Sequence, residues 1–408
     1  MLSYSYTARE LATGRKIKAE LQAQSEKAAT KLLQERGLVP LEITYKAAKG
    51  SPLDRFLNRI PTKEKVVFSR QLSTLINAGM PILQSLQTVS GQAKRKALVN
   101  VINKLVADIE GGSSFSQALS KHPTVFNSVY VSLVAAGETS GTLDVSLERL
   151  ANQQEKDADI ISKVRGAMIY PIIVFLVMIA VVIFMLTTVL PQVQNLYSGL
   201  PGVQLPLITR ILLGISHFVT RWAIIIIAVL GIAGFMTTRW ARTGPGKQVV
   251  DRLKMTLWPV GSLFMKLYMA RFSRTGATLV GSGVPLLQML NITADAVNNV
   301  HITASIEKAE EKVKGGKSLS ESLQGDPNFT ELVPNMIHIG EQSGALENML
   351  SKSADYYEKE VDQEIKTIST LVEPVLMIMM GIVAFIIVAA ILLPIYSLVG
   401  HIGVSGIR

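Results

Sequence analysis

The stretch AMIYPIIVFLVMIAVVIFMLTTVLP, from Ala167 to Pro191, decides the broad fold of this 408-residue chain. It lies in a longer run, from Gly166 to Thr209, that contains no charged residue. As a helix it would extend about 37 Å at ~1.5 Å per residue, which exceeds the roughly 30 Å hydrocarbon core of a bilayer. A buried core helix is the alternative for any apolar run, but length and composition predict a membrane span here.

Two further apolar runs follow. One lies between Arg221 and Arg239 and is centred on WAIIIIAVLGIAGFM. It reaches spanning length only if Arg221 extends its side chain to the interface, as Arg does near a helix end. The other run, from Pro374 to Leu398, is uncharged and dominated by Ile, Val, Leu and Met. We therefore predict three transmembrane helices, at 167–191, 217–238 and 374–398.

The basic residues predict the orientation of these spans. The chain has 41 Lys and Arg against 31 Asp and Glu, a net charge of +10, which is typical either of nucleic-acid binding or of a membrane protein's cytoplasmic loops. Twenty-three cations lie in 1–165 and fifteen in 239–373, but only two, Arg210 and Arg221, lie in 166–238. The positive-inside rule then predicts that both cation-rich segments are cytoplasmic and that nucleic acid is not a partner. A loop at 192–216 and a tail at 399–408 would be periplasmic.

Several kinds of chemistry are missing from the sequence. Charged residues are only 18% of the chain, the mean hydropathy is +0.32, and there is no cysteine for a disulfide or thiolate site. The five histidines form no metal-binding spacing. GPGKQ at 244–248 lacks the frame of a phosphate loop and follows no predicted strand. We expect a non-enzyme without metal or cofactor; the N-terminus, with Arg9 and Glu10 ahead of any apolar run, is not expected to be a signal peptide.

The chain also repeats itself. FSRQLSTLINAGMPILQSL (68–86) aligns with FSRTGATLVGSGVPLLQML (272–290) at 10 of 19 positions, and GGSSFSQAL (111–119) with GGKSLSESL (315–323) at five of nine. After a one-residue deletion, GETSGTLDVSL (137–147) meets GEQSGALENML (340–350) with six of eleven identical. Each repeat is a helical domain that ends in one span. The middle span is needed because two repeats of the same orientation require an extra crossing.

Within each repeat the pattern predicts helices. Phe68, Leu72 and Ile76 share one face of an amphipathic helix. Glycine pairs at 111–112 and 315–316 interrupt later helices, and Ser114 and Ser318 then follow as expected N-caps. The last helix, from about 141 or 345, contains no early Gly or Pro and is predicted to continue into the membrane.

The N-terminal segments differ from the helical repeats in their residue pattern. Alternating residues near Tyr4, the segment KIKAEL and the segment LVPLEI predict strands around a helix at 25–36 that Ser25 caps and Gly37 ends. LDRFLNRI (53–60) is a short amphipathic turn, either in a solvated linker or at the inner leaflet. The predicted fold is a mainly α, polytopic membrane protein with these parts: 1–45 α/β module; 46–63 linker; 64–166 helical repeat 1; 167–191 span; 192–216 loop; 217–238 span; 239–373 helical repeat 2; 374–398 span; 399–408 tail.

Acidic turns recur in the two repeats. Each GExSG motif has a glutamate in its second position and is followed by a second acid, Asp144 or Glu347. Such oxygen ligands could bind a divalent cation, could stabilise a helix N-terminus through its dipole, or could contact a protein partner. As candidate partner-binding turns the sequence offers Glu138, Ser140, Gly141, Glu341, Ser343 and Gly344.

These motifs carry a family resemblance. The chain resembles the inner-membrane platform proteins of type II secretion systems and type IV pili. The segments that carry the likeness are FSRQLSTLINAGMPILQSL, GETSGTLDVSLERLANQQE and their second copies, TGPGKQVVDRLKMTLWPVGSLFMKLYMARFSRT (243–275), and the N-terminal YSYTAREL and ERGLVPLEI. The likeness covers nearly the whole chain. The chain departs from the family pattern at 275–277, where Thr-Gly-Ala replaces an apolar helix start, and at Asn77.

The resemblance implies a function and partners. Such a protein sits in the bacterial inner membrane and couples a cytoplasmic hexameric assembly ATPase to the insertion of pilin or pseudopilin subunits into a filament. It implies contacts with the lipid bilayer and with other inner-membrane assembly proteins, and a homo-oligomeric state. Secretion, type IV pilus, competence and mannose-sensitive-type pilus systems remain open. A small-solute or protein transporter or channel, or a membrane-tethered enzyme, is the alternative.

Overall fold

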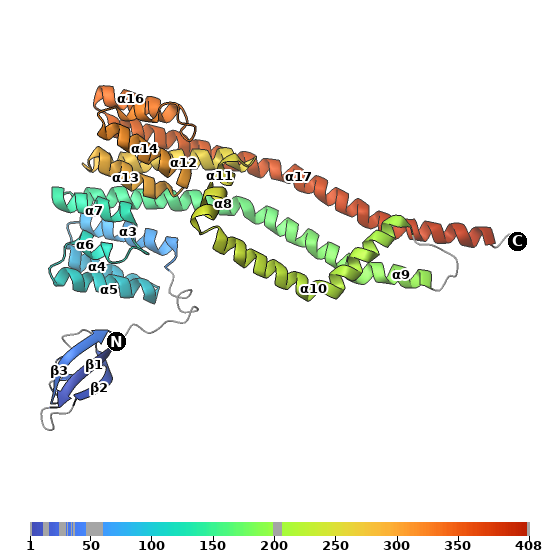
Figure 1. Ribbon diagram of the computed structural model, residues 1–408, viewed down its shortest axis with the longest axis horizontal. Helices are drawn as coiled ribbons and strands as arrows, with labels where there is room; N and C mark the ends of the chain where they lie inside the picture. The colour runs from blue at the N-terminus through green and yellow to red at the C-terminus, as the bar shows by residue number, and fades with distance from the viewer. Residues whose placement is uncertain are drawn as a thin grey trace. The chain divides into compact units, whose positions relative to one another are not determined.

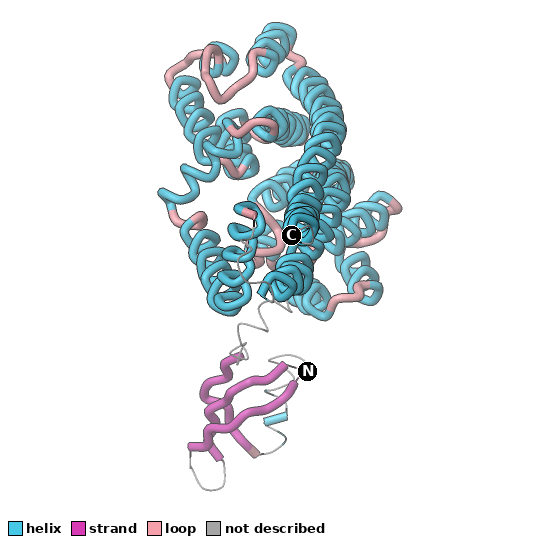
Figure 2. The backbone as a smooth tube through the Cα atoms, turned by 90° about the vertical axis from the view of Figure 1, so that its right-hand side faces the viewer, coloured by secondary structure: helices cyan, strands magenta, loops and turns pink. Residues whose placement is uncertain are grey.

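The computed structural model describes residues 2–10, 16–23, 30, 32–33, 35, 37–45, 60–198 and 206–405. The described part of the chain is mainly helical, and its strands form one small sheet (Figure 2). The chain divides into an N-terminal unit (1–61, with 95–98) and a helical unit (62–94, with 99–408). Each is described by itself. The fold class predicted from the sequence is confirmed.

The N-terminal unit holds three antiparallel strands in the order β2-β1-β3, namely β1 Leu2–Glu10, β2 Lys16–Ala23 and β3 Leu38–Tyr45. Tyr6 in β1 pairs with Ala19 on one side and Ile43 on the other. Tyr6 and Ala8 are buried, as the alternation of a half-buried strand requires. The expected cap Ser25 and all but the last residue of LDRFLNRI lie outside the described residues.

The first repeat is a bundle of helices whose ends are marked by turn and cap residues in the sequence. Gly79 adopts a left-handed φ of +81° between the first two helices, and Ser114 caps a short helix by accepting a hydrogen bond from the Gln117 N–H. Both signals were visible in the sequence. The helices are α3 Thr62–Asn77, α4 Ile82–Gln92, α5 Lys96–Glu110, α6 Phe115–Ser120, α7 Ser128–Ser140 and α8 Leu143–Phe184.

The second repeat follows the same plan. Gly283 has a φ of +79° and Ser318 accepts from the Glu321 N–H, so turn and cap recur at the matched positions. GPGKQ opens helix α11, which directly follows another helix, as expected for a motif that is not a phosphate loop. The helices are α11 Gly244–Thr256, α12 Val260–Gly281, α13 Leu286–Val297, α14 Val300–Lys314, α15 Leu319–Leu323, α16 Leu332–Ser343 and α17 Leu346–Ser405.

Three helices in the described residues are long and apolar enough to cross a membrane, and they contain the three predicted spans (Figure 1). α8 and α17 each run without a break from the repeat into the apolar segment, with Pro171 and Pro374 inside them. The third helix is α10 Leu207–Trp240. After α8, a π-helical turn, η1 Met185–Val189, leads into α9 Leu190–Ser198. The sides of the membrane remain predictions.

The segment expected as a periplasmic loop, 192–216, is largely helical where it is described, because α9 continues to residue 198 and α10 begins ten residues before 217. Its place outside the membrane stays a prediction. Packing explains the extension. Leu190, Leu213 and Ala390 form a buried apolar cluster between α9, α10 and α17. The Ser216 hydroxyl also donates to the Leu186 carbonyl (2.5 Å). Local composition does not reveal this burial. The expected tail is also helical as far as residue 405.

Candidate functional site

Each GExSG turn joins three helices, and its glutamate binds the start of the shortest one. In the first repeat the Glu138 carboxylate, at the end of α7, accepts from the Phe115 N–H (2.6 Å), the Ser116 N–H (3.0 Å) and the Ser116 hydroxyl (2.5 Å). These amides belong to the first turn of α6, whose N–H groups have no partner within the helix. A carboxylate there is also favoured by the helix dipole.

The second repeat reproduces this arrangement. Glu341, at the end of α16, accepts from the Leu319 N–H (2.7 Å), the Ser320 N–H (3.3 Å) and the Ser320 hydroxyl (2.5 Å) at the start of α15. Both glutamates are half-buried. The helix-dipole interpretation therefore applies, but to the N-terminus of a neighbouring helix rather than to the helix that follows the motif.

The other residues of the motif form the outer surface of the turn. Gly141 and Gly344 adopt left-handed φ values of +72° and +68°, which favour glycine. Ser140 and Ser343 are exposed, and their hydroxyls donate to carbonyls of their own helices. These four residues are accessible to a partner, whereas the two glutamate carboxylates are occupied by helix amides.

The leading glycine of the motif sets the distance between helices. A Cβ at Gly137 would lie 2.6 Å from the Ser146 Oγ, and one at Gly340 would lie 2.8 Å from the Leu346 Cα. Asp144 and Glu347 lie in the first turns of α8 and α17. Among the described residues, no group of three or more His, Asp or Glu side chains could hold a metal ion.

A second matched feature is an arginine from each FSR motif. In the first repeat Arg70 of α3 pairs with Glu155 of α8 (2.5 Å). In the second repeat Arg274 of α12 pairs with Glu358 of α17 (2.7 Å) and also contacts Asp355. Burial opposes the charge of Arg274, but the two carboxylates raise its pKa above the ordinary value. Each repeat therefore joins the helix that carries its FSR motif to its membrane-entering helix by an ion pair.

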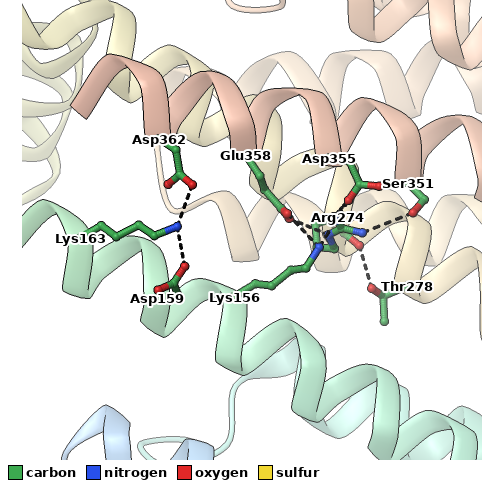
Figure 3. A network of polar contacts seen from close by, with 9 residues as sticks. All are labelled: Lys156, Asp159, Lys163, Arg274, Thr278, Ser351, Asp355, Glu358 and Asp362. Carbon is green, nitrogen blue, oxygen red and sulfur yellow. Dashed lines mark hydrogen bonds and ion pairs between the residues drawn. The ribbon is translucent and has the colours of Figure 1, made fainter. Parts of the chain in front are cut away.

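The two repeats meet along α8 and α17, at a row of ion pairs that we call the α8–α17 seam. Its cations are Arg149, Lys156 and Lys163, seven residues apart and therefore on one face of α8. The pairs are Arg149–Glu347 (3.1 Å), Lys156–Glu358 (2.9 Å), Lys156–Asp355 (3.4 Å) and Lys163–Asp362 (2.7 Å). Figure 3 shows Lys156 and Lys163 reaching from α8 to the acids of α17. Because residue numbers rise together on both sides, the two helices run parallel.

Apolar and buried polar contacts reinforce the α8–α17 seam. Ile160 of α8 packs with Leu263 of α12 and with Val361 and Ile365 of α17. The Gln153 amide donates to the buried Thr275 hydroxyl (3.0 Å). The departure from the family pattern at 275–277 thus lies where the second repeat packs against the first.

Sequence reasoning found the GExSG turns but missed this seam. The signal that could have found it is the seven-residue spacing of the α8 cations. On a single helix, however, such a stripe is typical of a solvated face. The partner acids lie about 200 residues away, for example 199 residues between Lys156 and Asp355.

Comparisons with known proteins agree with the repeat. The family model described as "Type II secretion system (T2SS), protein F" matches residues 68–191 and again 272–394, and the model of that protein's N-terminal domain matches 1–44. The type IV pilus assembly protein PilC of Thermus thermophilus is 39% identical, over 98% of this chain and 99% of its own length. PilC of Myxococcus xanthus is 34% identical, over 96% and 94%. The type II secretion system protein F of Pseudomonas aeruginosa is 34% identical, over 98% and 99%. The chain belongs to the type II secretion system protein F family.

Proposed function

We propose that this protein is an inner-membrane platform of a type IV pilus or type II secretion machine. It couples a cytoplasmic assembly ATPase to the insertion of pilin-like subunits into a filament, and it does not hydrolyse ATP itself. Its N-terminus is cytoplasmic and its C-terminus periplasmic. The family, the full-length likeness to proteins of both kinds of machine and the three candidate spans support this proposal.

The observation that carries the coupling is the continuity of α8 and α17. From Leu143 to Ala167, α8 provides about 36 Å of unbroken helix at ~1.5 Å per residue before the apolar segment begins. α17 does the same in the second repeat. A helix without a hinge transmits displacement of one end to the other, and the α8–α17 seam makes the two helices move together. The repeats then act as handles and the long helices as levers.

A flexible insertion tests the lever. A Gly-Ser stretch placed after Ser162 lies between the Lys156 and Lys163 ion pairs and interrupts α8 before the membrane. We expect membrane insertion and protein level to be retained and filament assembly to be lost. The same stretch inserted between Gln324 and Gly325, an exposed turn with a left-handed φ at the glycine, is the matched control and should assemble normally. Normal assembly by the Ser162 variant would refute the lever.

The exposed part of the GExSG turns is the proposed contact for the ATPase. Ser140 and Ser343 are exposed in equivalent positions. We expect the double substitution Ser140→Arg and Ser343→Arg to reduce co-purification with the ATPase while thermal stability is unchanged. Glu138→Gln is the comparison, because it weakens an internal hydrogen-bond site instead. If the double arginine variant retains both the ATPase and assembly, these turns are not the contact.

A further inference from the structure

The contact between the repeats is not symmetric. Residues of α8 correspond to residues 203 positions later in α17, so Arg149 matches Lys352 and Glu347 matches Asp144. A two-fold contact would contain both Arg149–Glu347 and Lys352–Asp144. Only the first is an ion pair within the described residues. Repeat 1 therefore contributes the cationic face of α8, and repeat 2 contributes a different, acidic face of α17.

In such a head-to-tail contact, one cationic face and one acidic face make no contact with the other repeat. On α17 the unused cationic face is Lys352, Lys359 and Lys366, the equivalents of Arg149, Lys156 and Lys163. All three lysines are exposed, and none forms an ion pair within the part of the chain that the structure describes. They keep the seven-residue spacing that aligns the cations of the α8–α17 seam. Tyr356, which is 49% exposed, lies on the same face.

On α8 the acidic face that makes no contact with the other repeat is Asp144, Glu155 and Asp159, the equivalents of Glu347, Glu358 and Asp362. Asp159 pairs within its own helix with Lys163 (2.7 Å), which also binds Asp362 of α17. Asp144 is exposed, and the Glu155 side chain is 42% exposed although it pairs with Arg70. In the α8–α17 seam, Glu358 binds both Arg274 and Lys156. Glu155 binds the matching arginine and has no second cation within the described residues. The acidic face of α8 thus repeats three of the four acids already in use on α17, since Asn152 stands where α17 has Asp355.

We propose that a second copy of this chain completes the pattern, with the Lys352–Lys359–Lys366 face of one copy binding the Asp144–Glu155–Asp159 face of the next. The expected pairs are Lys352–Asp144, Lys359–Glu155 and Lys366–Asp159. Because α8 and α17 run parallel, the operation that relates the repeats has its axis along these helices. Repeating it therefore gives the second copy the same orientation relative to the membrane.

The strength of this contact differs from that of the internal one. The apolar centre is not repeated, because Ile160 corresponds to Gln363, and Val361 and Ile365 correspond to Ala158 and Ser162. What remains is attraction between exposed charges, which is modest and screened by salt. The contact between copies is therefore reversible and salt-sensitive, whereas the contact within one copy is permanent. The proposal does not depend on the coupling function proposed above.

Cross-linking tests the geometry directly, because the chain has no cysteine and every introduced thiol is unique. Lys359 and Asn152 are the equivalents of Lys156 and Asp355, so Lys359→Cys and Asn152→Cys place two thiols across the proposed contact. In membranes treated with a short bis-maleimide, the double variant should give a ladder of linked species. A mixture of the two single variants should give a dimer, and each single variant alone should give none.

The internal control is Lys156→Cys with Asp355→Cys, which should link within one chain and produce no dimer. A double variant that does not link between chains while this control links would overturn the proposal. The proposal would also be overturned if either single variant alone formed a dimer in the same yield as the mixture. That result would indicate a two-fold contact, in which the same residue of both copies meets.

Charge reversal tests the chemistry. On the Lys359→Cys, Asn152→Cys background, Lys352→Glu should lower the cross-linked yield about five-fold at low salt, since repulsion replaces attraction. Adding Asp144→Lys should restore the yield, and high salt should lower it in the parent. An unchanged yield in the Lys352→Glu variant, or no restoration by Asp144→Lys, would refute the proposed pairing.

Discussion

The two matched arginines allow one prediction with an internal comparison. Arg274→Ala and Arg70→Ala remove the same residue from the same position of the two repeats. In the second repeat the Arg274 side chain is 16% exposed and Glu358 is 18% exposed. In the first repeat Arg70 is 35% exposed and Glu155 is 42% exposed. The two substitutions therefore differ mainly in how far the carboxylate that loses its arginine, Glu358 or Glu155, is shielded from water.

The expected costs follow from this difference. Removing one partner of a fully buried pair costs roughly 3–5 kcal/mol. Lys156 remains 2.9 Å from Glu358 after the substitution and compensates part of its charge, so Arg274→Ala should cost about 2–3 kcal/mol. An exposed pair contributes about 0.5–1 kcal/mol, which is the expected cost of Arg70→Ala. At about 2–4 °C per kcal/mol, the melting temperature should fall by about 4–12 °C for Arg274→Ala and about 1–4 °C for Arg70→Ala.

The measurement is thermal loss of helical circular dichroism by the full chain in detergent at neutral pH. Arg252→Ala serves as a control, because Arg252 is exposed and its guanidinium forms no ion pair within the described residues. Its melting temperature should match that of the parent. Equal decreases for Arg274→Ala and Arg70→Ala would refute the reasoning, since burial would then not decide the cost of losing the pair.

Three further predictions use the same melting assay. Glu138→Ala removes three hydrogen bonds from the start of α6 and should cost about 1–2 kcal/mol, with Glu138→Gln closer to the parent; an unchanged melting temperature for the alanine variant would contradict the capping role. Gly137→Ala places a Cβ 2.6 Å from the Ser146 Oγ and should cost about 1–3 kcal/mol, whereas Gly91→Ala, which meets nothing within 4 Å, should be neutral or stabilising. Burial lowers the pKa of His122, so the unfolded chain binds its proton first and stability should fall as the pH drops below about 6.5. The His122→Gln variant should lose less stability over that range, and an identical pH profile would exclude this role.

The sequence by itself determined the features that depend on neighbouring residues. Three apolar runs predicted the three long apolar helices, because a run of that length and composition is visible without any partner. The doubled FSR and GExSG motifs predicted the repeat that the family model matches twice. Glycine turns and serine caps were also readable, since each acts within a few residues of itself.

Only the tertiary structure decided which faces meet. Glu138 was readable as an acidic turn residue, but its hydrogen bonds to α6 reach 22 and 23 residues back along the chain. The stripe of Arg149, Lys156 and Lys163 has the appearance of a solvated face in the sequence, and so does its copy on α17. The first stripe forms ion pairs with acids of the second repeat, whereas its copy on α17 forms none within the described residues. Local propensity is the same for both stripes, so the difference arises from packing between segments about 200 residues apart, which no local pattern encodes.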